Sequence, residues 1–139
     1  MASILKIDEL QGLTTTGDIT VTSEGGAATM QLQQGLAKAW IDHNQVTTHS
    51  IRDSFNISSI TDAGTGKTYP ISFTSTMSSS SYAGSMYSSA NTTDNYATFN
   101  NQNTGGLGSK TTSSFGHNSY SSTHVDAIRN DNIIHGDLA

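Results

Sequence analysis

The feature that most constrains the fold of this chain is its shortage of large apolar side chains. Leu, Ile, Val and Phe make up 25 of the 139 residues, whereas Ser and Thr make up 41. A domain of this length normally buries about 70% of the surface of its unfolded chain, and few side chains here can fill such an interior. Chains that are short of core material are commonly completed by partner chains. We therefore expect an oligomer.

The charge pattern argues against several functional classes. Only 12% of the residues are charged and the net charge is −5, which is too little for a charged disordered tail. The six basic residues are scattered and the pI is near 5.3, so we expect no binding to nucleic acid. No stretch approaches the ~20 apolar residues that cross a bilayer. Residues 1–10 lack the continuous apolar segment of a secretory signal, and we expect no membrane association.

Residues 1–26 are expected to form an arm. Its apolar residues do not keep one period for long, and residues 14–21 have the β-branched richness of a strand. The paired glycines at 25 and 26 indicate a hinge or tight turn. Residues 27–36 follow with the only run of good helix formers, ended by Gly35, and predict a short helix or linker of at most three turns.

Residues 37–139 predict a β-module. Apolar residues alternate in residues 37–43, 51–57 and 69–73, as expected for strands with one buried face. The turn-rich residues 62–67 predict a hairpin between the second and third of these strands. Further strands are expected at residues 82–88, 96–100, 111–115 and 124–129, with Ile133 and Ile134 in or near a last one. The expected fold is mainly β, a small antiparallel β-sandwich or barrel, jelly-roll-like.

Gly64–Thr68 resembles part of a phosphate-binding loop, but its context is wrong. The required first glycine is replaced by Thr61, and a strand pattern rather than a helix follows at residues 69–73. Without a helix N-terminus there is nothing to hold the phosphates. We interpret the segment as a hairpin turn.

No catalytic, metal or cofactor site is expected. The chain has no cysteine, and its five histidines show neither the i, i+4 pairing of a zinc protease nor a His-x-His repeat. There is no Gly-x-Ser-x-Gly sequence. Five aromatic residues could form a receptor-facing patch, or could instead serve core and inter-chain packing: Tyr82, Tyr87, Tyr96, Phe99 and Tyr120.

Two parts of the chain resemble virion structural proteins of marine tailed bacteriophages, of the cyanophage and pelagiphage type. Residues 4–12 and 17–21 are similar to the amino-terminal arms of tail-fibre-like and capsid-associated proteins. Residues 34–41, 51–66 and 69–73 are similar to a β-module of the same group. Residues 43–45 and Pro70 depart from that pattern, and the resemblance covers about half of the chain.

The resemblance implies a non-enzymatic virion component, a short fibre, spike or decoration protein, assembled in the bacterial cytoplasm. It implies a homotrimer whose arm docks on capsid, collar, tail or baseplate proteins through Ile4, Leu5, Ile7 and Leu10. The β-module would face outward, with Tyr82, Tyr87 and Tyr120 as candidate receptor-facing residues. The alternative is a module that binds host-surface glycans.

Overall fold

A computed structural model describes residues 6–10, 19–22, 26, 28–89, 96–99, 110–120 and 123–139. Contacts between Cα atoms divide the chain into two compact units, Met1–Leu36 and Ala37–Ala139. Within the described residues, no helix has the length and apolar character needed to cross a bilayer.

The described residues of the first unit form a two-stranded antiparallel pair and one helical turn. Strand β1 (Thr20–Thr22) pairs antiparallel with β2 (Thr29–Gln31), and α1 (Leu32–Gly35) follows at once. The helix expected over residues 27–36 is therefore wrong for its first half. Pairing with β1 supplies hydrogen bonds that a marginal isolated helix of this length could not match.

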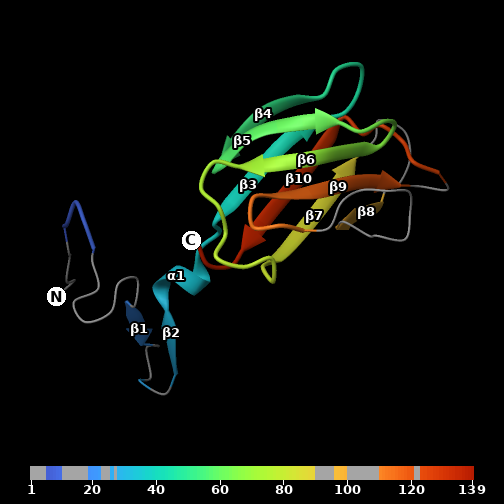
Figure 1. The fold of residues 1–139 in the computed structure, drawn as a ribbon. Coiled ribbons are helices and arrows are strands. Elements are labelled where there is room, and N and C mark those ends of the chain that lie inside the picture. Colours follow the sequence, from blue (N-terminus) through green and yellow to red (C-terminus); the bar gives the residue numbers. More distant parts are fainter. Residues whose placement is uncertain are drawn as a thin grey trace. The chain divides into compact units, whose positions relative to one another are not determined.

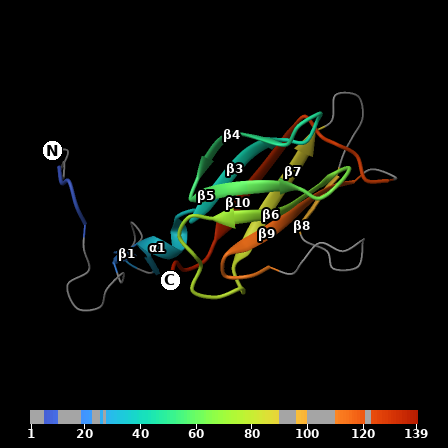
Figure 2. The same ribbon diagram turned by 45° about the horizontal axis from the view of Figure 1, so that its top comes forward.

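The second unit is a sandwich of two antiparallel four-stranded sheets, which confirms the mainly β prediction (Figure 1 and Figure 2). One sheet has the order β4-β3-β10-β7 and the other β5-β6-β9-β8. The strand bounds are β3 Ala39–Asn44, β4 Ser50–Phe55, β5 Ile57–Asp62, β6 Lys67–Phe73, β7 Ala83–Ser89, β8 Tyr96–Phe99, β9 Ser114–Tyr120 and β10 Arg129–His135. Two expected strands are displaced. Residues 111–113 precede β9, and residues 124–128 lie outside the named strands, so that only Arg129 of the strand expected at 124–129 belongs to β10.

The chain passes from one sheet to the other at Asn56, between β4 and β5. Asn56 has a φ of 57°, a left-handed conformation that Asn tolerates better than most residues. Its side-chain Nδ2 donates to the carbonyl oxygens of Lys38 and Ser75, at 3.0 and 3.1 Å. This bend is why Phe55 and Ile57 do not share one strand face, as the alternation over residues 51–57 had predicted.

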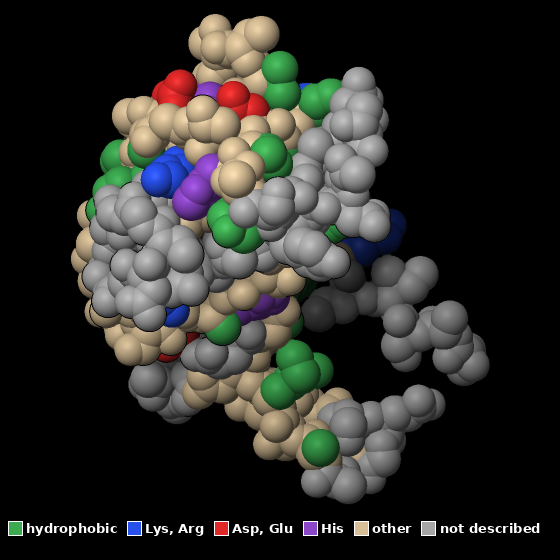
Figure 3. Space-filling model, turned by 90° about the vertical axis from the view of Figure 1, so that its right-hand side faces the viewer, with side chains coloured by type: hydrophobic (Ala, Val, Ile, Leu, Met, Phe, Trp, Pro, Cys, Tyr) green, Lys and Arg blue, Asp and Glu red, His purple; other side chains and the backbone are tan. Residues whose placement is uncertain are grey.

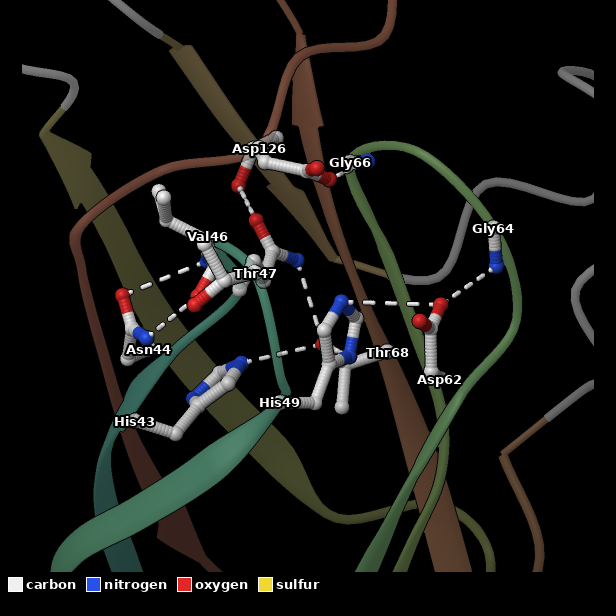
Figure 4. Close-up of polar contacts among 12 residues, drawn as sticks. His43, Asn44, Val46, Thr47, His49, Asp62, Gly64, Gly66, Thr68 and Asp126 are labelled. Atoms are coloured by element: carbon white, nitrogen blue, oxygen red, sulfur yellow. Dashed lines mark hydrogen bonds and ion pairs between the residues drawn. The ribbon is translucent and has the colours of Figure 1, made fainter.

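The hairpin predicted at residues 62–67 is confirmed between β5 and β6. Gly64 and Gly66 have φ values of 108° and 68°, which favour glycine. A Cβ on Gly66 would lie 2.6 Å from the Ser119 carbonyl oxygen, so no side chain fits there. The Gly66 N–H also donates to Asp126 Oδ1 at 2.6 Å, which ties the turn to the loop before β10 (Figure 4).

The interior of the sandwich has two chemically different halves. The apolar half contains Ala39, Ile41, Ile71, Phe73, Met77, Tyr82, Phe115 and Ile134. The polar half contains His43, Gln45, Thr68, Ser88, His117, Ser119, Asn130 and Asn132, each at most 2% exposed. The register explains the division, since Ile134 pairs with Ala39 while Asn130 pairs with His43 further along the same two strands.

Candidate functional site

A shallow groove on the outer face of the β4-β3-β10-β7 sheet is the first candidate site. It has a volume of about 360 Å³ and is lined by Trp40, Ile41, Asp42, Asp53, Asp131, Asn132 and Ile133. Asp42 pairs in register with Asp53 on β4 and with Asp131 on β10, so three carboxyl groups stand side by side. Trp40 pairs with Ile133 and Phe55 in the neighbouring row, which places an aromatic and aliphatic surface beside the carboxyl row. We call this region the outer groove.

Two arginines partly balance the carboxyl row of the outer groove. Asp42 Oδ1 accepts from Arg52 Nη1 at 3.2 Å, and Asp42 Oδ2 lies 3.9 Å from Arg129 Nε. Burial, and then the nearby Asp42 charge, raise the pKa of Asp131 above its ordinary value. The groove can therefore accept hydrogen bonds through its carboxyl groups and present the flat ring of Trp40.

The three tyrosines expected to face a receptor do not form one patch. Tyr82 is 4% exposed and belongs to the apolar half, so the expectation that it faces a receptor is wrong. Its ring packs edge-on against Phe73, and its hydroxyl donates to the Ser114 carbonyl at 2.9 Å. Tyr87 and Tyr120 are exposed, but they lie on the outer faces of different sheets, because their neighbours Ser88 and Ser119 meet in the interior.

Of the other residues predicted to bind partners, the structure describes only some. Ile7 and Leu10 of the arm are 49% and 53% exposed. Ile4 and Leu5 lie outside the described residues, as do the side chains of Tyr96 and Phe99. On the face of the molecule drawn in Figure 3, the hydrophobic side chains of the described residues are scattered among polar ones.

In the polar half, Ser88, His117 and Asn132 form a row that resembles a nucleophile, base and orienting group. His117 Nε2 lies 2.7 Å from Ser88 Oγ, and His117 Nδ1 lies 2.7 Å from Asn132 Oδ1. All three residues are at most 2% exposed, so no external substrate reaches the serine. Burial lowers the pKa of His117 to about 4, which makes it a weak base. We interpret this row as a structural network that joins the two sheets.

A second polar cluster surrounds the Thr68 hydroxyl. Thr68 Oγ1 lies 3.2 Å from His43 Nε2, 3.3 Å from His49 Nδ1 and 3.1 Å from Gln45 Nε2. On the far side of its ring, His49 Nε2 lies 3.5 Å from Asp62 Oδ1. Figure 4 shows His49 standing between Thr68 and Asp62, with His43 approaching Thr68 from β3. We call this arrangement the Thr68 cluster.

The carboxamide of Gln45 completes the Thr68 cluster. Its Oε1 accepts from Ser119 Oγ at 2.8 Å and from the Ala127 N–H at 3.1 Å, while its Nε2 donates to Thr68 Oγ1. Gln45 follows β3 of one sheet and Thr68 is on β6 of the other, so this contact crosses the sandwich. Both residues are at most 1% exposed.

The two central histidines are held uncharged. Burial, followed by the influence of His117 and His49, lowers the pKa of His43 to about 3. The rings of His43 and His117 meet edge to face with centroids 5.2 Å apart. Among the described residues no group of three His, Cys, Asp or Glu side chains is placed to hold a metal ion.

Sequence reasoning missed both the outer groove and the Thr68 cluster. A signal for His43 was present, because the alternation that buries Ala39 and Ile41 continues to His43 on the same strand face. Nothing local indicates that Thr68 meets Gln45, since these residues are 23 positions apart and belong to different sheets.

Comparisons of this chain with protein-family models, with curated proteins and with solved structures found no match.

Proposed function

We propose that this chain is a non-enzymatic structural protein of a bacteriophage particle, a short fibre, spike or decoration protein. Its first unit docks on the capsid, collar, tail or baseplate, and its sandwich faces outward. The jelly-roll-like character of the sandwich and its trimeric state are part of this proposal. The resemblance of residues 4–12, 17–21, 34–41, 51–66 and 69–73 to virion proteins is its starting point.

The observation that carries the proposal is the separate first unit with its exposed apolar side chains. Five apolar residues there are 42–54% exposed: Ile7, Leu10, Val21, Met30 and Leu36. Apolar side chains that a partner protein would remove from water favour docking. An extended segment of ~20 residues also reaches about 65 Å, far enough to add a strand to a neighbouring subunit.

The first test is the mass of the assembled protein in solution. Sedimentation equilibrium of the full chain at micromolar concentration should give three times the 14.7 kDa of one chain. Replacing Ile7 and Leu10 by Asp should leave the sandwich folded and abolish attachment to particles that lack the native protein. A stable species of 14.7 kDa would contradict the trimer. Attachment that survives the double substitution would contradict docking through these two residues.

A second candidate function, binding of host-surface glycans, is favoured by the outer groove. Sugars are commonly held by an aromatic ring face together with carboxylates that accept hydrogen bonds from hydroxyl groups. Trp40 supplies the ring, and Asp53 and Asp131 supply acceptors beside it. The groove replaces the tyrosine patch as the best candidate surface, because Tyr82 is buried.

A glycan array separates this second candidate from a purely structural role. Trp40→Ala should remove binding of any glycan that the native protein retains. Tyr120→Ala changes the outer face of the opposite sheet and is the matched control. Absence of glycan binding by the native protein, or loss of binding in the Tyr120→Ala control alone, would exclude the groove as the sugar site.

A further inference from the structure

We propose that Thr68 and Gln45 react with each other to form an intramolecular ester that links the two sheets covalently. Their side chains touch, with Gln45 Nε2 3.1 Å from Thr68 Oγ1, and both are buried. The surrounding groups supply the four components of an acyl transfer: a nucleophile, a base, a polarised carbonyl and donors for the developing oxyanion. The reaction occurs once in each chain, so it is compatible with a protein that turns over no substrate.

The base is His49, which contacts Thr68 Oγ1 through Nδ1 at 3.3 Å. A hydroxyl is a weak nucleophile until a neighbouring base accepts its proton. Asp62 lies 3.5 Å from the opposite ring nitrogen of His49, where a carboxylate orients the ring and stabilises the imidazolium that forms. Asp62 is thus a positioning residue, because it acts through His49.

His43 also contacts the Thr68 hydroxyl, but its surroundings make it a poor proton acceptor. It is fully buried, and the charged and titratable groups that influence it are His117, His49 and Arg52, with no carboxylate among them. With its Nε2 protonated, His43 can donate to Thr68 Oγ1, which leaves the hydroxyl hydrogen of Thr68 directed at His49. His43 therefore orients the nucleophile.

The Gln45 carbonyl is held by donors at the position where negative charge would develop. Gln45 Oε1 accepts from the Ala127 N–H at 3.1 Å and from Ser119 Oγ at 2.8 Å. Two donors directed at one carbonyl oxygen make an oxyanion hole, and removal of one such donor typically slows acyl transfer by about 100-fold or more.

The atoms balance without any further reactant. Thr68 Oγ1 attacks Cδ of Gln45 as its proton moves to His49 Nδ1, giving a tetrahedral intermediate whose oxygen is held by Ala127 and Ser119. The C–N bond then breaks, and the proton on His49 passes to the departing nitrogen. The products are an ester between Thr68 Oγ1 and Gln45 Cδ and one molecule of ammonia.

Burial explains why such an ester would persist. Thr68, Gln45 and Ala127 are at most 1% exposed, so hydrolytic water is excluded once ammonia has left. The chain contains no cysteine and cannot form a disulfide. The ester would close a loop between the end of β3 and β6, and closing a loop in the unfolded chain stabilises the folded state, as a disulfide does.

The test is the intact mass of the full-length protein, measured after denaturation. The cross-linked chain should be lighter than its sequence mass by one ammonia, about 17 Da. Fragmentation should place the link between Thr68 and Gln45, and hydroxylamine should cleave it. Thr68→Val keeps the shape of the side chain and should restore the sequence mass. The matched control is Thr65→Val, in the exposed hairpin turn, which should still lose one ammonia.

The rate of mass loss in freshly folded protein tests the assigned roles. His49→Ala should slow the loss by at least about 100-fold, and Asp62→Asn should slow it by less, while the circular dichroism of both variants remains that of the native sandwich. A native protein with its full sequence mass would overturn the proposal, whether or not the variants fold. A loss of 17 Da that persists in Thr68→Val would also overturn it, since succinimide formation at an asparagine releases one ammonia too.

Discussion

The apolar and polar halves of the sandwich interior are enclosed by the same strands but are stabilised in different ways. In the apolar half, side chains such as Ile71 and Phe115 contribute by leaving water and packing closely. In the polar half, His117 and Asn130 lie at equal depth and must be paired to offset their lost hydration. The comparison shows that a chain with few large apolar residues can still enclose an interior in which most buried polar side chains pair with one another. Among the described residues, exceptions include His43 Nδ1, Asn132 Nδ2 and both polar atoms of the Asn118 side chain, which have no hydrogen-bond partner.

The largest expected effect is acid unfolding that originates in the polar half. Burial lowers the pKa values of His43 and His117 to about 3 and about 4, below the 6.5 of an unfolded chain. Between the folded and unfolded pKa values of these histidines, the unfolded state binds more protons than the folded state. The stabilisation that comes from keeping the two histidines neutral is therefore fully present above pH 6.5 and is lost as the pH is lowered toward 4. Urea unfolding from pH 8 to pH 4 should show this fall, and His117→Gln should flatten it. A midpoint independent of pH would contradict the neutral histidine pair.

The next largest effect is expected from truncation in the apolar half. Phe115 is fully buried and packs against Phe73 with ring centroids 5.4 Å apart. Phe115→Ala should lower the free energy of unfolding by about 3–5 kcal/mol, because it removes apolar burial and leaves a cavity. The loss should be similar at pH 8 and pH 5, unlike the acid effect. Phe55→Ala, at a site that is 52% exposed, is the control and should cost far less.

A smaller effect is expected from removing one hydroxyl in the polar half. Ser88 Oγ contacts His117 Nε2, Ser119 Oγ and Asn130 Oδ1, each within 2.9 Å. Ser88→Ala would leave buried polar atoms without a partner and should cost about 1–3 kcal/mol in chemical denaturation. Ser85→Ala, on an exposed site of the same strand, should change stability by much less. Equal effects of the two substitutions would mean that the network contributes nothing.

The smallest effect should come from the ion pair outside both halves. Arg52 Nη1 and Asp42 Oδ1 are 3.2 Å apart, with 36% and 25% of the two side chains exposed. Arg52→Ala should lower the free energy of unfolding by no more than about 1 kcal/mol, because solvent screens such pairs. Raising the salt concentration should reduce this difference further. If Arg52→Ala lowered the free energy of unfolding as much as Phe115→Ala does, this surface ion pair would contribute as much to stability as the buried interior.

Sequence patterns predicted the turn and the strand face that depend only on residues close together in the chain. The hairpin at residues 62–67 follows from residues suited to a tight turn, and its two glycines adopt positive φ. Ala39 and Ile41 share the buried face of β3, as their alternation indicated. The helix predicted over residues 27–36 was wrong for its first half, because Thr29–Gln31 pairs with β1, while Leu32–Gly35 is helical. Pairing between segments cannot be predicted from helix propensity.

The sequence alone determined that the chain is β-rich and low in both charge and large apolar side chains. Only the tertiary structure decided which polar groups meet there. The contact of Thr68 with Gln45, the pairing of His117 with Ser88, and the burial of Tyr82 all depend on strands that are distant along the chain. Period 2 assigns a residue to a face of its strand, but the register and the crossing between sheets determine what that face meets.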